Sequence, residues 1–279
     1  MIAIACGLAA AVSFAISTLC ATRASRLIGP APVLAWVALI GLVLTAGIAA
    51  AQRPVPTAPQ AGWLAIAGLG NAAGLVLEYM AVRSQKVGVV APIISTEGGI
   101  AAAIAVLAGE RLPGTVLAAL SAVAAGAVLV AWPTADDRGD LKGNVRGSAL
   151  ASCAAIVFGL SIYATGHVAA LPVGWVVVPP RIAGVAFVAV PLAIGRRLKL
   201  TRSAAALVAT AAVCEVTGFA AYTFGARQNI AVTAVMASLF ASLAAIGAYV
   251  LFSERLGRAA RIGIVIIAAG VGVVAAIHP

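Results

Sequence analysis

The chain has 279 residues, of which 63% are hydrophobic and only 9% are charged, and its mean hydropathy is +1.12. This composition excludes a water-soluble domain, because a soluble surface of this size requires far more charged side chains. The formal net charge of +10 arises from basic residues between apolar runs, which indicates anchoring at the cytoplasmic side of a membrane and argues against a nucleic-acid partner.

Continuous apolar runs dominate the chain. A β-barrel strand would instead alternate at every second residue, so the runs predict membrane-spanning helices. A helix of about 20 residues crosses a hydrocarbon core. Ten segments are long enough to do so: 2–20, 32–51, 61–82, 87–108, 114–132, 147–166, 172–194, 204–226, 230–252 and 258–277. Arg23 and Arg26 follow the first segment and no basic residue precedes its apolar core, which predicts a mature helix there and not a signal peptide.

An internal repeat relates the two halves of the chain, with a shift of 144 residues. The matched positions are Glu254-Arg255-Leu256 with Glu110-Arg111-Leu112, Gly218 with Gly74, Arg227 with Arg83, Gly270 with Gly126, Phe158 with Phe14, and Ser161 with Ser17. A fixed repeat of this kind governs the fold assignment. It predicts two units, 1–132 and 147–279, joined by a polar cytoplasmic linker, 133–146. The two Glu-Arg pairs are interpreted as charge pairs at helix ends.

An odd number of spans in each unit makes the second unit enter the membrane from the opposite face. The basic residues agree, because in each pair of equivalent loops the excess of Lys and Arg moves to the other copy. Loops on one face hold 14 of these residues, and those on the other face hold three. The basic face is expected to be cytoplasmic, which places both termini on the far side. The predicted fold is therefore an all-α membrane protein with ten transmembrane helices in two inverted five-helix repeats.

Four ionisable residues lie inside the predicted spans: Glu78, Glu97, Glu215 and Arg181. Each charge opposes insertion by about 2.5–3.5 kcal/mol at mid-span, so these side chains must face one another, water or a ligand. Tyrosines accompany them on three of the segments. The predicted substrate-binding set is Glu78, Tyr79, Glu97, Tyr163, Arg181, Glu215 and Tyr222.

In this hypothesis the carboxylates meet an ammonium group and Arg181 meets a carboxylate. Three alternatives stay open: the acids form structural ion pairs, Arg181 is only their counter-ion, or the tyrosines are anchors at the lipid interface. Pro92 and Gly98-Gly99 flank Glu97, and Pro179-Pro180 precede Arg181. Such residues open backbone groups toward a cavity or simply bend a spanning helix.

Other chemistry has little support in the sequence. The four cysteines are isolated, without a CxxC spacing, so neither a disulfide framework nor a metal site is expected. Only His167 and His278 are present, both near segment ends, and no Walker, HExxH or GxSxG motif occurs. The protein is therefore not expected to be an enzyme or to bind a cofactor.

The double five-helix unit, in which a small-residue-rich helix is followed by ERL and a glycine-rich final helix, resembles the EamA domains of the drug/metabolite transporter superfamily. Within it, the chain is similar to YddG-like amino-acid exporters. The resemblance covers the whole chain and implies a ten-helix, inverted-repeat secondary transporter in a bacterial inner membrane. One departure is clear: the family's usual Trp-Gly in the first helix of each unit is Phe14-Ala15 and Phe158-Gly159 here.

Taken together, the residues and the resemblance predict a transporter that exports amino acids or related small metabolites by alternating access. Efflux of cationic drugs is the alternative, favoured by three buried acids against one buried base. The expected partners are a small-molecule substrate and the lipid bilayer. Substrate identity, direction of transport and proton coupling stay open at this stage.

Overall fold

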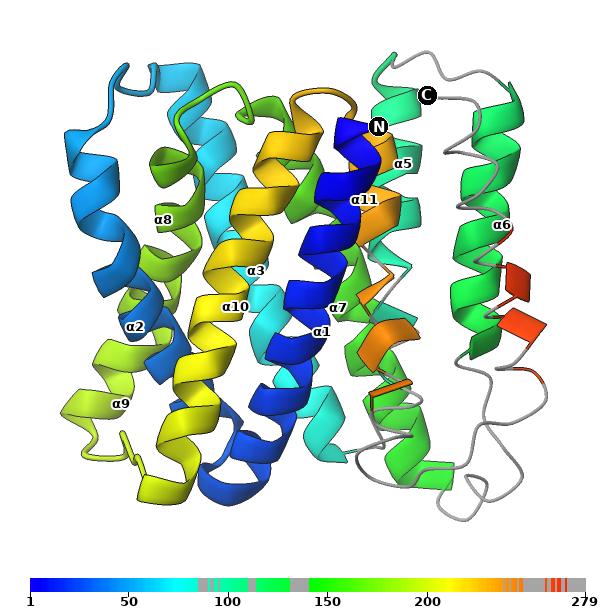
Figure 1. Ribbon diagram of the computed structural model, residues 1–279. Coiled ribbons are helices and arrows are strands. Elements are labelled where there is room, and N and C mark those ends of the chain that lie inside the picture. The colour runs from blue at the N-terminus through cyan, green and yellow to red at the C-terminus, as the bar shows by residue number, and fades with distance from the viewer. Residues whose placement is uncertain are drawn as a thin grey trace.

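The computed structural model describes residues 1–84, 90, 93–94, 96–109, 114–130 and 141–237, together with 239–240, 242–244, 246–247, 259, 262–263, 265–266 and 269 (Figure 1). Both ERL motifs, residues 133–140 of the predicted linker and most of the predicted segment 258–277 lie outside these residues.

Every regular element of the described residues is a helix, as the apolar runs predict. The elements are α1 (Ile2–Ile28), α2 (Pro30–Ala51), α3 (Ala58–Ser84), α5 (Glu97–Leu107), α6 (Gly114–Val130), α7 (Leu141–His167), α8 (Val173–Gly184), the π-helix η2 (Val185–Ala189), α9 (Val190–Ile194), α10 (Arg202–Ala226) and α11 (Ile230–Ala237). The prediction of an all-helical chain is thus confirmed for the described part, whereas the number of ten transmembrane helices stays a prediction.

Among the described residues, six stretches are long and apolar enough to cross a membrane. They are Ile2–Ile28, Pro30–Ala51, Ala58–Ser84, Arg146–His167, Val173–Ile194 and Arg202–Ala226. Each coincides with a predicted segment, so the prediction of a multi-pass membrane protein is confirmed. The helix α7 begins at Leu141, before the predicted start at residue 147, so the helix includes the end of the predicted polar linker.

The span after α7 is irregular. Pro179 and Pro180 lie inside α8, and the helix continues through the π-helix η2 into α9. Proline lacks the N–H that the helix needs and clashes with the preceding turn, and a π segment is a common local adjustment in such helices. The neighbouring helix α3 approaches this region closely, because a Cβ atom at Gly68 would lie 2.8 Å from the carbonyl carbon of Pro179.

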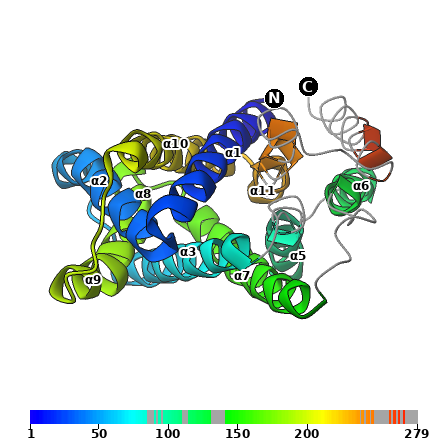
Figure 2. The same cartoon turned by 90° about the horizontal axis from the view of Figure 1, so that it is seen from below.

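Two pairs of long helices form the centre of the bundle: α1 packs along α10, and α3 packs along α7 (Figure 2). The shift of 144 residues exchanges these two pairs. A Cβ atom at Gly74 of α3 would lie 2.5 Å from the Phe158 ring of α7, and one at Gly218 of α10 would lie 2.6 Å from the Phe14 ring of α1. Repeat-related positions therefore make equivalent contacts.

Hydrogen bonds between the helices repeat in the same way. Ser17 Oγ donates to the Ala211 carbonyl at 3.2 Å, and Ser161 Oγ donates to the Ala67 carbonyl at 2.8 Å. The shift of 144 residues relates Ser17 to Ser161 and Ala67 to Ala211. The repeat shift thus exchanges the two central helix pairs, and the inverted orientation of the two units stays a prediction.

Basic residues gather at one end of the bundle. The ends of α1 and α3 and the starts of α7 and α10 lie at the lower side in Figure 1, whereas α2 and α10 end at the upper side. At or beside the lower ends are Arg23, Arg26, Arg83, Lys142, Arg146, Arg196, Arg197, Lys199 and Arg202, and beside the upper ends are Arg53 and Arg227. This asymmetry is the pattern that distinguishes the cytoplasmic face in multi-pass proteins.

The close approach of α3 to α8 generates a stability prediction. Gly68→Ala forces the Pro179 backbone to move, and overpacking of this kind costs about 1–3 kcal/mol. We expect a lower midpoint of thermal unfolding for the purified variant in detergent, measured by size-exclusion chromatography after heating. Gly62→Ala on the same helix is the matched control, because nothing lies within 4 Å of its added Cβ. Equal midpoints for the two variants would contradict this description of the contact.

Candidate functional site

A cavity lies at the centre of the bundle, between the two exchanged helix pairs. Its volume is about 50 Å³. A single water molecule needs about 10–15 Å³ of such a cavity. The lining residues are Phe14, Ser17, Thr18, Asn71, Leu75, Glu78, Tyr79, Glu97, Phe158, Ser161, Ile162, Glu215, Phe219, Tyr222 and Phe240. The cavity has room for several waters or for a small chemical group.

Most of the lining residues are related by the repeat. The related pairs are Phe14 with Phe158, Ser17 with Ser161, Thr18 with Ile162, Asn71 with Glu215, Leu75 with Phe219, and Glu78 with Tyr222. The cavity is therefore lined by repeat-related positions of both halves of the chain. The two sets differ in chemistry, however, since a carboxylate in one half is replaced by an amide or a phenol at the equivalent position in the other.

Glu78 and Glu215 are held by adjacent residues of α1. Thr18 Oγ1 donates to Glu78 Oε1 at 3.2 Å, and Ser17 Oγ lies 3.3 Å from Glu215 Oε2. Ser17 has one hydroxyl hydrogen and also lies within hydrogen-bonding distance of the Ala211 carbonyl. If the bond to Glu215 breaks, the Ser17 hydroxyl can still donate to the Ala211 carbonyl.

A similar contact lies on the opposite side of the cavity. Tyr222 OH donates to the Ile162 carbonyl at 3.0 Å, at the positions equivalent to Glu78 and Thr18.

Glu97 enters the cavity from the first residue of α5. The amino-terminal end of a helix favours a negative charge, because its N–H groups point toward it. Gly159 of α7 allows α5 to come close, since a Cβ atom there would lie 2.7 Å from Ile100 and 3.1 Å from the Glu97 carbonyl oxygen. The side chains of Glu78, Glu97 and Glu215 are each at most 6% exposed.

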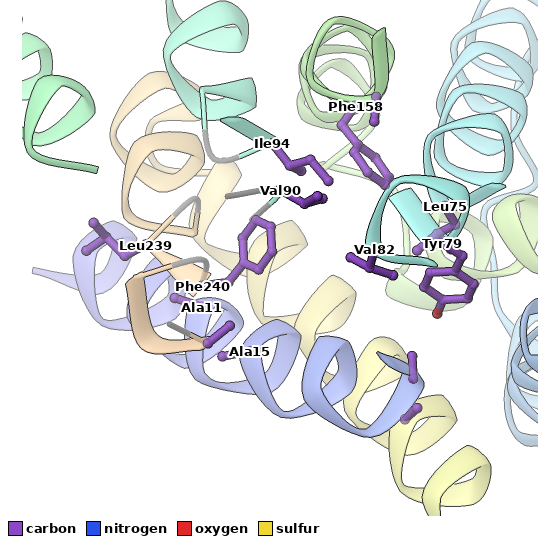
Figure 3. Close-up of a cluster of buried hydrophobic side chains, with 14 of the residues drawn as sticks. Ala11, Ala15, Leu75, Tyr79, Val82, Val90, Ile94, Phe158, Leu239 and Phe240 are labelled. Atoms are coloured by element: carbon purple, nitrogen blue, oxygen red, sulfur yellow. The ribbon is translucent and has the colours of Figure 1, made fainter. Parts of the chain in front are cut away.

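Aromatic rings supply the apolar part of the wall. Phe14 meets Phe219 and Phe240 edge to face, with ring centroids 5.7 and 6.4 Å apart. Figure 3 shows the Phe158 ring extending toward Leu75 of α3, whereas the Phe240 ring lies near Val90. A cavity with three carboxylates and several aromatic faces suits an organic ammonium group attached to an apolar body.

Arg181 is buried but does not line the cavity. It is 2% exposed, and its guanidinium carbon lies 5.2 Å from the centroid of the Phe219 ring. The Phe219 ring is also part of the cavity wall, so Arg181 lies next to the cavity. Of the predicted binding residues, the structure thus brings Glu78, Tyr79, Glu97, Glu215 and Tyr222 together, with Arg181 behind the Phe219 side of the wall.

Tyr163 lies elsewhere. It borders a second pocket with Ala105, Ala108, His167 and Ile230. The His167 ring lies between Trp63 and Tyr163, with ring centroids 4.5 Å from each. Tyr163 follows Ile162, which faces the central cavity, and one helical residue turns a side chain by about 100°.

The sequence reasoning did not select several residues of the wall for binding. They are Phe14, Ser17, Thr18, Asn71, Leu75, Phe158, Ser161, Ile162, Phe219 and Phe240. Four of them, Phe14, Ser17, Phe158 and Ser161, are repeat-matched positions, so equivalence under the shift was the signal that identifies them. Within the described residues, no group of three or more His, Cys, Asp or Glu is arranged to hold a metal ion.

Comparison with known proteins agrees with this architecture. A protein of known crystal structure superimposes with a TM-score of 0.76 over 97% of this chain and 95% of its own, at 20% sequence identity, which shows a shared fold. No curated protein matches the chain at a significant level. Residues 1–132 match the model of the EamA-like transporter family. The first half of the chain is therefore similar to the domain of the EamA-like transporter family.

Proposed function

We propose that the protein is a secondary transporter that exports amino acids or related small amine-bearing metabolites across a bacterial inner membrane. In this proposal ten helices form two inverted five-helix units, residues 1–132 and 147–279, with the linker 133–146 in the cytoplasm and both termini outside. The equivalent contacts of α1 with α10 and of α3 with α7 support this arrangement, because inverted repeats of one fold meet about a two-fold axis.

The observation that carries the proposal is the convergence of Glu78, Glu97 and Glu215 on one cavity of an apolar bundle. Carboxylates are expensive to bury in a membrane, and residues of this kind mark solute or ion pathways. An ammonium group that enters the cavity would form charge-assisted hydrogen bonds with them. The six lining rings would contact the apolar remainder of the solute.

Alternating access requires contacts that both units share and can exchange. Ser17 and Thr18 of the first unit bind Glu215 of the second unit and Glu78 of the first. An ammonium group that competes for these carboxylates would loosen α1 from α10. Binding of solute would thereby be coupled to rocking of one unit against the other.

Efflux of cationic drugs is the second candidate. Arg181 is absent from the cavity lining, so in this conformation the wall presents carboxylates and no cationic side chain of the described residues. A lipophilic cation without a carboxylate would suit this wall. Uptake of a labelled amino-acid panel and of a lipophilic cation into liposomes, with and without a pH gradient, separates the two candidates and reports proton coupling.

Neutralising the carboxylates tests the cavity directly. We expect Glu78→Gln, Glu97→Gln and Glu215→Gln each to reduce transport in liposomes by about tenfold or more, because each removes a charge-assisted contact with the ammonium group. Thr217→Val on α10 is the control, since Thr217 is exposed and bonds only to its own helix. Normal transport by all three variants would refute the proposed pathway.

The inverted orientation has its own test. Ser84 ends α3 and Gln228 follows α10; the repeat shift relates these two exposed positions. In a protein without its four native cysteines, Gln228→Cys should react with a membrane-impermeant maleimide added to intact cells. Ser84→Cys should react only after the membrane is permeabilised. Labelling of both from the same side would show that the two units are oriented alike.

A further inference from the structure

Arg181 occupies a position that is shaped for it. Its stem passes over Gly41 of α2, where an added Cβ would lie 3.0 Å from Nε and 3.2 Å from Cδ. Any side chain at residue 41 would therefore displace the guanidinium group. On its other side the guanidinium group stacks on the Phe219 ring, which favours a cation.

Two nitrogen donors of this guanidinium group have no partner among the described residues. Within the part of the chain that the structure describes, Nε and Nη2 are buried and have no hydrogen-bond partner. A buried cation without partners is unfavourable, so such groups are normally paired or reserved for a ligand. The nearby Glu215 is itself bonded to Ser17.

The Phe219 ring lies next to the guanidinium group and is also part of the cavity wall. A rotation of this side chain would bring two unused donors to the edge of the cavity. A planar guanidinium group with parallel N–H donors matches the geometry of a carboxylate. The carboxylates Glu78 and Glu215 lie on the cavity side of the same ring.

We propose that Arg181 is a carboxylate-binding subsite, screened by Phe219, that selects amino acids over the corresponding amines. This inference rests on the proposed transport function and specifies its substrate class. The substrate's ammonium group lies among the glutamates, and its carboxylate reaches Nε and Nη2 once the Phe219 ring has turned aside. Arg181 thereby determines specificity, whereas the glutamates bind both kinds of solute.

The test uses the full-length protein, purified for equilibrium binding and reconstituted in liposomes for uptake. The probes are phenylalanine with phenethylamine and leucine with isoamylamine, because the members of each pair differ by one carboxylate. We expect the wild-type protein to bind each amino acid about tenfold or more tightly than its amine. In Arg181→Gln, amino-acid binding should weaken about 10- to 100-fold, as expected for loss of hydrogen bonds to a charged group, while amine binding is unchanged.

Two further variants keep the test decisive if Arg181→Gln does not fold. Arg181→Lys retains the charge and loses the bidentate geometry, so it should weaken amino-acid binding alone. Gly41→Ala should do the same to a smaller extent by shifting the guanidinium group. Gly47→Ala on the same helix is the matched control, because nothing lies within 4 Å of its added Cβ. Phe219→Leu should accelerate amino-acid association, and an unchanged rate would contradict the screening role.

The outcomes distinguish this inference from the proposed function. Equal effects of Arg181→Gln on amino acids and amines, or transport of amines alone by the wild-type protein, would overturn the subsite and leave the transporter. Failure of the wild-type protein to transport either class would overturn both. Repeating the transport measurements in chloride and in gluconate identifies the anion that Arg181 binds. If transport requires chloride in the wild-type protein but not in Arg181→Gln, the guanidinium group binds a free anion, and the substrate carboxylate is rejected as its ligand.

Discussion

The burial of charge in an apolar bundle is the constraint on which the rest of this structure depends. Three carboxylates and a guanidinium group lie within helices that otherwise consist almost entirely of apolar and small residues. Each of these charges opposes insertion by a few kcal/mol, so the bundle must supply hydrogen bonds, water or a ligand. Ser17 and Thr18 supply part of this stabilisation to the two carboxylates nearest α1. The remaining requirement explains why the three carboxylates line one cavity.

Small residues make this arrangement possible. Association of helices in lipid depends on close van der Waals packing, which favours glycine at the contacts. Gly74 and Gly218 let the Phe158 and Phe14 rings lie against α3 and α10, beside the cavity. Gly68 similarly admits the proline-broken α8, and Gly41 admits the Arg181 stem. The same glycines that permit packing therefore also position the groups of the site.

The sequence predicted the helical membrane class and the buried acids because both have a local signal: a charged residue in a long apolar run is conspicuous whatever the tertiary structure. The positions of Arg181 and Tyr163 depend instead on helix rotation. Arg181 follows two prolines and precedes a π-helix, which together break the regular angular relation between residues. Tyr163 is one residue beyond the cavity-facing Ile162, and no local pattern distinguishes these two neighbours. Phenylalanines such as Phe219 are indistinguishable from ordinary lipid-facing residues until the fold is known.

Repeat-related positions around the cavity keep the same packing side chains but differ in their polar side chains. Phe14 and Phe158, and likewise Ser17 and Ser161, are identical across the repeat. The repeat equivalent of Glu78 is instead Tyr222, and that of Asn71 is Glu215. A symmetric wall would bind a solute equally well in two orientations. The unlike polar groups of this wall would favour one orientation over the other, because the carboxylates and the phenol bind different parts of one molecule. Unlike polar groups at repeat-related positions would favour a solute whose two ends differ, as those of the proposed amino-acid substrates do.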